Sequence, residues 1–418
     1  MAKAKYTTHH GMVDILPGEV EKWRALENIV RDEAAKFNFE EIRTPIMEQT
    51  ELIKRGIGQL TDIVTKEIFA FTKGDSNYVL RPELTAPVVR AYVQHNMAQR
   101  GGTQKLFYIG PMFRAERPQK GRQRQFHQFG VEIIGSGNPV ADVECIAFMM
   151  RIYERIGIKN FNLKLNSVGD PESRDAYKAV LKEYLTPHFD QLSELSQKRL
   201  EKNPMRILDS KEPEDQEFIK NAPLIKDHLN EESAEHFKKV CSSLTSLGIE
   251  YTIDPLLVRG MDYYTKTAFE LTSPDLGSQD ALAGGGRYDL LVEEIGGQPT
   301  PSVGFAAGME RLLIACEELG IELAEDKSVD VFIVTLGEAA RDWALTTLPV
   351  LRKHGISSTM DYLDRSMRAQ MKDANRENAR YALIVGDNEL ETNTFTLRNM
   401  KESEESQLTL EQILEKLA

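Results

Sequence analysis

A short basic segment is the first place in this sequence where residue types and spacing could do chemistry. Between Phe113 and Gln128, two strand-like runs flank a loop that carries one acid, Glu116, and five cations. The cations are Arg114, Arg117, Lys120, Arg122 and Arg124. Guanidinium groups present planar, paired donors to phosphate oxygens, so a hairpin with these cations at its mouth could bind a polyphosphate. The alternative is a solvated basic loop, which charge runs usually form.

A second segment gives an independent reason to expect an anion. The run Ser302–Leu313 passes from small residues into a helical pattern, and Gly304 and Gly308 would let a flat ligand approach the backbone. Arg311 falls in the first helical turn, where the helix dipole disfavours a cation. An anionic ligand explains that position better than helix stability does, although an ion pair with a neighbouring acid would also fit.

Two further runs combine glycine with arginine and tyrosine. Leu257–Thr265 reads Leu-Val-Arg-Gly-Met-Asp-Tyr-Tyr-Thr and places Arg259 at the end of an expected strand. Ala283–Tyr288 contains three consecutive glycines, which are costly unless the backbone must approach another group. Tyr263 and Tyr264 could be core residues with satisfied hydroxyls, but the neighbouring arginine favours a functional role.

Carboxylates supply the opposite charge. In Leu80–Pro87 a strand leads into a helix, for which Thr85 can serve as the N-cap. Glu83 lies just outside that helix, where its carboxylate could receive an ammonium group. Glu132 lies on the strand after the basic hairpin, and if it points inward it is a buried carboxylate that needs a polar partner.

These segments must be positioned by a mixed architecture of helices and strands. Apolar residues at helical spacing predict a helix over Glu19–Phe37, and Pro45 favours a short strand over Glu41–Ile46. Later strands follow one another with few helical crossovers, which favours an antiparallel sheet and an α+β fold. The later strands are expected at Glu67–Thr72, Tyr78–Arg81, Lys105–Arg114, Gln125–Ile134, Asn162–Val168, Leu256–Arg259, Thr267–Thr272 and Gly304–Ala307.

Changes in hydrophobic spacing and charge density along the chain predict three domains. Residues 1–169 and 252–325 are expected to form one core built on the antiparallel sheet. Residues 170–251 have helical spacing and dense charge, which indicates a helical insertion. Residues 329–418 alternate strands with helices, which predicts a separate α/β domain with a parallel or mixed sheet.

Composition excludes several classes of protein. The 418 residues are 41% apolar and 28% charged, and no run approaches the ~20 apolar residues that a membrane span needs. No secretory signal is visible, so we expect a cytoplasmic protein without a membrane partner. A net charge of −13 disfavours a nucleic-acid partner unless cations are concentrated locally. Widely separated Cys145, Cys241 and Cys316 argue against a disulfide framework or a zinc site, and we expect no metal bound by the protein alone.

Taken together, these segments resemble the histidyl-tRNA synthetase family, which belongs to the class II aminoacyl-tRNA synthetases, and the resemblance runs essentially from end to end. Thr44-Pro45 looks like the dimer-forming motif 1 of the class, Phe113–Glu132 like motif 2 and Gly304–Leu313 like motif 3. Leu257–Tyr264 and Ala283–Asp289 look like the two histidine-specific signatures. The resemblance implies a homodimeric ligase with a C-terminal anticodon-binding domain. Such an enzyme activates L-histidine with ATP and transfers it to the 3′ end of tRNA(His).

The resemblance also implies roles for individual residues. Arg259 and Arg114 would be catalytic, and Mg²⁺ would be bound mainly through ATP. ATP would be held by Arg114, Arg122 and Arg311. Histidine would be held by Glu83, Thr85, Arg114, Gln128, Glu132, Arg259, Tyr263, Tyr264 and Tyr288. The tRNA would contact Arg117 and Gln119 in the hairpin and Arg365, Arg368 and Lys372 in the C-terminal domain.

Two departures from the family pattern concern only local placement. His10-Gly11 stands where the family usually has Arg-Gly, and Leu84 stands where glycine is common. One alternative is the non-catalytic, synthetase-like regulatory subunit of histidine biosynthesis, which lacks the full signatures and the anticodon domain. Another is a synthetase for a different amino acid, which would have to explain both histidine signatures.

Overall fold

The strands on either side of the basic loop are neighbours in an eight-stranded sheet. Its order is β1-β5-β6-β11-β10-β9-β7-β8, with parallel pairing only at the two edge pairs β1–β5 and β7–β8. The inner pairs are antiparallel, which confirms the expected sheet. The strands are β1 (Glu40–Glu41), β5 (Gln104–Phe113), β6 (Gln125–Ile134), β7 (Asn162–Ser167), β8 (Thr252–Ile253), β9 (Thr265–Thr272), β10 (Ala281–Arg287) and β11 (Ser302–Gly308).

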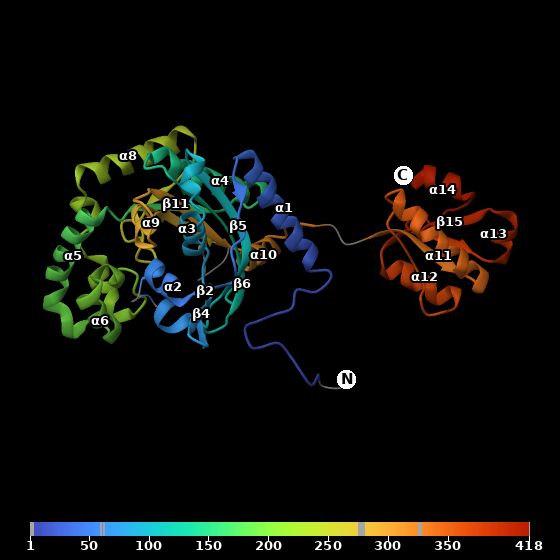
Figure 1. Cartoon of the computed structure of the whole chain (residues 1–418), viewed down its shortest axis with the longest axis horizontal. Helices are drawn as coiled ribbons and strands as arrows, with labels where there is room; N and C mark the ends of the chain where they lie inside the picture. Colours follow the sequence, from blue (N-terminus) through green and yellow to red (C-terminus); the bar gives the residue numbers. More distant parts are fainter. Residues whose placement is uncertain (1–3, 59–60, 62, 275–280, 325–327, 418) are drawn as a thin grey trace. The chain divides into compact units, whose positions relative to one another are not determined.

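The chain forms two units in the computed structural model, which describes residues 4–58, 61, 63–274, 281–324 and 328–417 (Figure 1). One unit takes in residues 1–16 and 22–323, and the other takes in residues 17–21 and 324–418. The predicted domain ends at residues 1, 325 and 418 lie outside the described residues. Among the described residues, no helix combines the length and the apolar character that a membrane crossing requires.

The main core lies on one face of the eight-stranded sheet. Alternate residues of β6, Phe129, Val131 and Ile133, pack there against the helices. Because side chains alternate across a strand, Glu132 between them points to the opposite face. The helices of this core are α1 (Val20–Lys36), α4 (Pro139–Ile156), α8 (Glu231–Ser246) and α10 (Met309–Glu318).

The opposite face carries smaller elements around the position of Glu132. Leu106 and Tyr108 of β5 pack there with Val88 of α3 and Leu291 of α9. A three-stranded antiparallel sheet in the order β2-β4-β3 belongs to the same unit. The elements are β2 (Met47–Gln49), α2 (Thr50–Ile57), a π-helix (Ile63–Glu67), β3 (Phe69–Lys73), β4 (Ser76–Leu80), α3 (Thr85–Gln94), a 3₁₀ turn (Met97–Arg100) and α9 (Leu291–Glu294).

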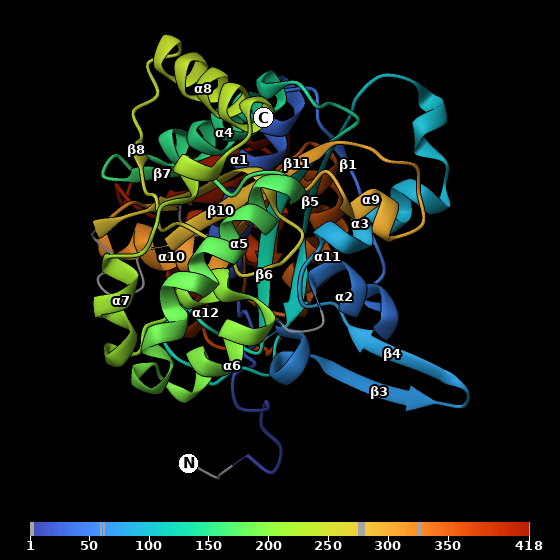
Figure 2. The same ribbon diagram turned by 90° about the vertical axis from the view of Figure 1, so that its left-hand side faces the viewer.

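Most of the predicted insertion has a hydrophobic cluster of its own. Tyr177, Leu181 and Leu200 belong to this cluster, whereas Val240 and Leu244 of α8 pack into the main core. In Figure 2 the green helices α5, α6 and α7 lie together. The elements are α5 (Pro171–Leu185), α6 (Glu194–Lys202), α7 (Gln216–Lys220) and the 3₁₀ turns Thr186–Gln191, Pro204–Ile207, Pro213–Asp215 and Ile225–His228.

The second unit is built on a mixed five-stranded sheet in the order β13-β12-β14-β15-β16. β13, β12 and β14 are parallel, and β15 and β16 are antiparallel, as the alternating pattern predicted. The strands are β12 (Val329–Thr335), β13 (Ser358–Met360), β14 (Ala379–Val385), β15 (Phe395–Asn399) and β16 (Glu405–Leu408). The helices are α11 (Glu338–Lys353), α12 (Met367–Arg376), α13 (Asp387–Thr392) and α14 (Leu410–Leu417).

In the first unit, the strands expected at Glu41–Ile46 and Leu256–Arg259 do not form as predicted. Residues 42–46 lie between β1 and β2 in irregular backbone, and residues 256–259 are also irregular. Around the second segment, the side-chain amide of Asn166 donates to the carbonyls of Pro255 and Leu257, at 3.3 and 2.9 Å. A side chain thus satisfies polar groups that a strand would have paired with a neighbouring strand.

Candidate active site

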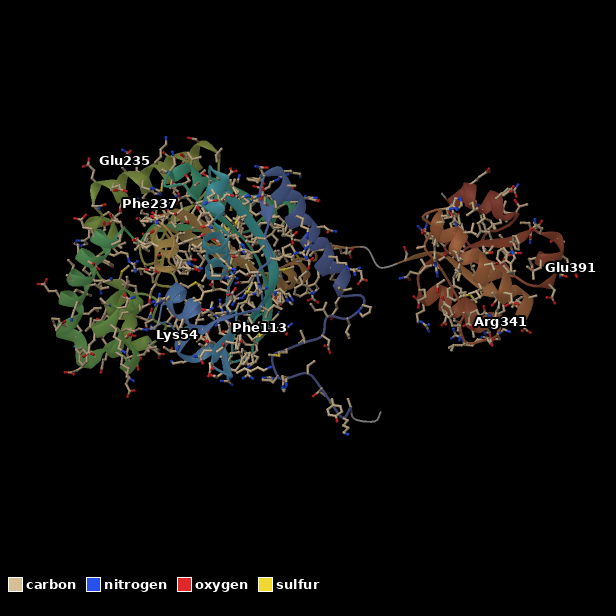
Figure 3. All side chains as sticks on the ribbon, in the orientation of Figure 1. Lys54, Phe113, Glu235, Phe237, Arg341 and Glu391 are labelled. Carbon is tan, nitrogen blue, oxygen red and sulfur yellow. The ribbon has the colours of Figure 1, made fainter. Side chains whose placement is uncertain are left out.

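A cavity of about 440 Å³ lies beside β5 and β6, on the face of the sheet opposite the main core. Residues of the β5–β6 hairpin, of β11, of the start of α10 and of the loop that carries Arg259 form its wall. Figure 3 labels Phe113, the last residue of β5, which precedes the lining residue Arg114. Ten of the residues predicted from the sequence line the cavity: Glu83, Thr85, Arg114, Arg122, Gln128, Arg259, Tyr263, Tyr264, Tyr288 and Arg311. Segments separated by more than two hundred residues therefore meet at one site.

Glu132 lies just behind the cavity wall and is completely buried. Tyr288 donates its hydroxyl to the carboxylate at 2.5 Å, Thr85 donates at 2.8 Å and Tyr108 at 3.2 Å. A Cβ on Gly304 would lie 1.8 Å from Glu132 Oε2, so only glycine leaves room for this carboxylate. Burial raises the pKa of Glu132 to about 8 despite its hydroxyl donors. The sequence-based expectation of a buried, partnered carboxylate is confirmed.

Glu83, rather than Thr85, caps the start of α3. The Glu83 carboxylate accepts the backbone N–H groups of Thr85 at 2.6 Å and Ala86 at 3.0 Å. The predicted N-cap role of Thr85 is wrong, because its hydroxyl is used by Glu132 and the helix already begins at this residue. Burial raises the pKa of Glu83, and the two backbone donors oppose that rise. An anionic group at the edge of the cavity remains suited to an ammonium ion.

Arg259 enters the cavity from an irregular loop. The prediction that Arg259 ends a strand is wrong, because residues 256–259 are irregular and the side chain of Asn166 bonds to the backbone there. Arg259 Nη1 donates to Glu270 on β9 at 2.6 Å. A Cβ on Gly284 would lie 2.0 Å from Arg259 Nη2, so the glycine run of β10 leaves space for this guanidinium.

The guanidinium of Arg259 is charged and has a hydrogen-bond donor that no described residue uses. Burial lowers the pKa of Arg259, but the neighbouring Tyr264 and Glu270 more than offset this and hold it above its ordinary value. Arg259 Nε is buried without a hydrogen-bond partner among the described residues. The same is true of Gln128 Oε1, which also belongs to a cavity-lining residue. Buried unpaired polar atoms in a cavity are suited to a polar ligand.

Three more arginines line the cavity, and their positive charges lie close together. Arg114 donates to the carbonyl of Pro82 at 3.0 Å, and Arg311 donates to that of Ala281 at 2.8 Å. Arg122 pairs with Glu116 at 3.2 Å. Burial lowers the pKa of Arg311, and the nearby cations Arg122 and Arg114 lower it further. An anionic ligand would relieve this repulsion, as the basic hairpin predicted.

The tyrosines form a connected aromatic wall. The ring centroids of Tyr263 and Tyr264 are 4.7 Å apart, and those of Tyr263 and Tyr288 are 5.6 Å apart. A Cβ on Gly286 would lie 2.8 Å from the Tyr264 ring, so the glycine run also leaves space for this ring. Arg287 has a different role from its neighbours, because it is fully buried and pairs with Asp142 and, at 3.0 Å, with Asp289.

The structure also places residues in or beside the cavity that sequence reasoning missed. Tyr108, which sequence reasoning did not single out, bonds to Glu132, and Glu270 bonds to Arg259. The insertion contributes three lining residues: Arg199, Arg206 and Asp209. For Glu270, the alternation of β9 around buried Phe269 was a usable signal. No signal in the sequence indicated that the insertion reaches the site.

The residues predicted to contact tRNA do not line the cavity. Arg117 and Gln119 are exposed in the loop of the β5–β6 hairpin. In the second unit, Arg368 and Lys372 are exposed on α12. Arg365 differs from them, because its guanidinium pairs with both Asp361 and Asp373. The positive charge of Arg365 is therefore largely neutralised locally.

Comparison with known proteins agrees with this arrangement. The family model for histidyl-tRNA synthetase matches residues 11–312, and the model for the anticodon-binding domain matches residues 330–418. A histidine–tRNA ligase of Chloroherpeton thalassium is 50% identical over 99% of this chain and 98% of its own length. One of Halothermothrix orenii is 48% identical over 97% of each chain.

A solved structure agrees as well. The apo histidyl-tRNA synthetase of S. aureus superimposes with a TM-score of 0.85 and 41% identity, covering 99% of both chains. Sequence matches at this level span the signatures, the insertion and the C-terminal domain alike. This chain therefore belongs to the histidyl-tRNA synthetase family.

Proposed function

We propose that this protein activates L-histidine with ATP to form histidyl-adenylate and transfers the histidyl group to the 3′ end of tRNA(His). The observation that carries the proposal is the polarity of the cavity. Glu83 and Glu132 lie at or behind one part of its wall, and Arg114, Arg122 and Arg311 line another. One cavity thus offers carboxylates for an amino acid's cationic groups and cations for a polyphosphate.

Histidine would be held by both its ends. Its ammonium group would meet Glu83, Thr85 and Gln128, whose buried Oε1 lacks a partner among the described residues. A neutral imidazole has one N–H donor and one acceptor, so a selective pocket needs a fixed acceptor and a fixed donor. Glu132 would supply the first and the Tyr264 hydroxyl the second, with Tyr263 and Tyr288 completing the wall.

ATP would lie against the arginines, with its α-phosphate near Arg114 and Arg259. The histidine carboxylate attacks this phosphorus, an oxygen–phosphorus bond forms, and the bond to pyrophosphate breaks. No protein nucleophile is needed, because positioning and cationic stabilisation lower the barrier. The buried Nε of Arg259, which has no partner among the described residues, is a donor available to the α-phosphate as its charge rises.

We place Mg²⁺ on the nucleotide rather than in a protein cage. Among the described residues, no three His, Cys, Asp or Glu side chains gather as a metal site. Mg²⁺ commonly keeps several waters and binds through substrate phosphates and one or two carboxylates. Glu116, which pairs with Arg122 at 3.2 Å, and Glu270, which bonds to Arg259 at 2.6 Å, are carboxylates of the cavity wall beside the proposed nucleotide.

Transfer to tRNA would use exposed surfaces of both units. Arg117 and Gln119 would face the acceptor end, and Arg368 and Lys372 would meet the RNA backbone from α12, with Arg365 at the edge of this patch. Residues 329–418 carry 11 basic and 15 acidic side chains, a net of −4, so binding depends on this local patch. Because a charged tRNA is used in protein synthesis, we place the enzyme in the cytoplasm.

The regulatory-subunit alternative is disfavoured by the complete site. Arg259 and Arg311 are both present in the cavity, and residues 330–418 match the anticodon-binding domain. A regulatory protein would need neither the polyphosphate-binding arginines nor an RNA-binding domain. Retention of both favours catalysis.

An ATP–pyrophosphate exchange assay with each of the twenty amino acids tests the proposed reaction. We expect exchange to depend on histidine and on Mg²⁺, because the pocket pairs an acceptor with a donor suited to imidazole. Charging of a tRNA(His) transcript by the same preparation measures the second step. Exchange with another amino acid alone, or none with histidine, would refute the proposal.

Replacing Arg259 with alanine tests its role toward the α-phosphate. Removing a preorganised donor of this kind typically lowers the rate ~10²–10³-fold. We expect single-turnover adenylate formation to slow by that order, while equilibrium binding of ATP and histidine changes much less. A rate within about threefold of wild type would contradict the role, since even a modest charge-assisted bond is worth more.

Glu132→Gln tests recognition of the imidazole. The variant keeps the shape but replaces an acceptor oxygen by an amide NH₂ group that can only donate, so we expect a large rise in the histidine KM with nearly unchanged ATP affinity. Equilibrium binding of each ligand to the purified variant measures both effects. If histidine affinity is unchanged, Glu132 is structural and the imidazole contact lies elsewhere, first around Tyr288.

The raised pKa of Glu132 predicts that the free energy of unfolding depends on pH differently in the wild type and in Glu132→Gln. With a pKa of about 8 when folded and an ordinary value near 4.5 when unfolded, Glu132 holds a proton only in the folded state between these pH values. Its contribution is therefore complete below pH 4.5 and is lost as pH rises toward 8, by up to about 1.4 kcal/mol per pH unit. Urea unfolding at pH 5 to 8 should show this slope in wild type relative to Glu132→Gln. Parallel profiles would contradict it.

We also propose a homodimer that forms through the small three-stranded sheet. Ile46 and Met47 are 43% and 52% exposed, and Phe71, 45% exposed, stacks on Tyr78 with ring centroids 5.7 Å apart. β2 pairs with β4 and β4 with β3, so Met47, Phe71 and Tyr78 belong to one small sheet, and Ile46 directly precedes it. An exposed group of large apolar side chains favours a protein interface.

Light scattering at micromolar concentration should give a mass near twice 47.3 kDa. In the double variant Ile46→Arg/Met47→Glu we expect a monomer, because two charges would be buried in the interface. Leu247→Glu, at a 60% exposed position just after α8, is the matched control and should remain dimeric. A fully active wild-type monomer would count against this interface.

A further inference from the structure

The insertion contacts the loop that carries Arg259 directly. Arg206, in the 3₁₀ turn after α6, donates from Nη2 to the carbonyl of Gly260 at 2.7 Å. Its Nη2 and Nε also donate to Asp262 Oδ1, at 3.1 and 3.3 Å. Asn203 donates its side-chain amide to the same carboxylate oxygen at 3.1 Å. Arg206 therefore binds both the residue that follows Arg259 and the acid two positions further on.

A second arginine of the insertion also bonds to this loop. Arg174 of α5 donates to the carbonyl of Tyr264 at 2.8 Å and to that of Asp262 at 3.3 Å. Arg174, Asn203 and Arg206 together form a clasp over residues 260–264. The side chains of Val258 and Tyr264 also pack against the hydrophobic cluster of the insertion.

The other side of the loop is fixed by the core. The backbone N–H of Asp262 donates to the carbonyl of Ile57 at 3.2 Å. Gly58, with φ of +104°, lies so close that a Cβ there would be 2.5 Å from Asp262 Oδ2. The Asp262 side chain is thus held between Asn203 and Arg206 of the insertion and Gly58 at the end of α2.

Within the cavity, Arg259 interacts with Glu270 and with Tyr264, which is itself part of the clasped loop. Its side chain makes one ion pair, with Glu270, and its Nε has no partner among the described residues. Gly260, which follows it, has no atoms within 4 Å of where a Cβ would be built. The space on the side-chain side of this glycine is open, and its carbonyl accepts the 2.7 Å bond from Arg206.

We propose that Arg206 is a positioning residue of the insertion, which clasps Gly260 and Asp262 and thereby sets the placement of Arg259 for attack on the α-phosphate. The inference rests on the proposed role of Arg259. Because a displacement of about 1 Å can cost ~10² in rate, loss of the clasp acts on the chemical step more than on ligand binding. The insertion is accordingly part of the catalytic machinery as well as a separate helical region.

Arg206→Gln tests the clasp in the full-length protein. We expect single-turnover adenylate formation to slow at least about tenfold, with equilibrium binding of histidine and ATP changed less than about threefold. Arg206→Lys keeps one charged donor and should recover part of the rate. Lys202→Gln, at the exposed end of α6, removes the same charge nearby and should behave as wild type.

Double variants distinguish positioning from a general loss of structure. If Arg206 acts through Arg259, then Arg206→Gln should add no further loss to Arg259→Ala, and it should share its loss with Asp262→Asn. Multiplied effects, or a wild-type rate for both Arg206→Gln and Asp262→Asn, would overturn the clasp. A normal rate for Arg259→Ala would instead overturn the proposed role of Arg259, so the two failures are distinguishable. Asp262→Asn also supplies the test if Arg206→Gln does not fold.

Discussion

A carboxylate buried in the middle of a sheet is the constraint on which the site depends. Glu132 is completely enclosed, and an unpartnered buried carboxylate would be costly. Its three hydroxyl donors come from three places: Thr85 at the start of α3, Tyr108 on β5 and Tyr288 after β10. Satisfying one acid thus ties together elements that are far apart in the chain. The same bonds bring the start of α3 beside the sheet, where Glu83 caps it.

Glycine makes this arrangement possible, because the functional side chains lie flat on neighbouring strands. Gly304 leaves room for Glu132, Gly284 for Arg259 and Gly286 for the Tyr264 ring. A Cβ at any of the three would meet those side chains at 2.8 Å or less. The glycines that weaken the intrinsic stability of a strand therefore have a steric reason here. The crowded arginines have a comparable reason, since repulsion among them favours an anionic ligand.

The insertion connects with this centre from outside the sheet. Its helices pack in a hydrophobic cluster that also includes Ala268 of β9, and Arg174 and Arg206 reach the loop between Arg259 and Tyr264. The glycine run of β10 and the clasp hold that loop from different directions. The loop that carries Arg259 is therefore in contact with a helical region as well as with the sheet.

The sequence by itself determined the elements whose signals are local. The consecutive strand-like runs Lys105–Arg114 and Gln125–Ile134 predicted an antiparallel hairpin, and the cations between them predicted an anion site that the cavity wall agrees with. What only the tertiary structure decided are contacts between distant segments. The hydroxyl of Thr85 bonds to Glu132, 47 positions away, instead of capping the helix. In place of a strand at 256–259, the side chain of Asn166 bonds to the carbonyls of Pro255 and Leu257. The contact of Arg206 with Asp262 likewise joins residues 56 positions apart, and no pattern of spacing within either segment encodes such a meeting.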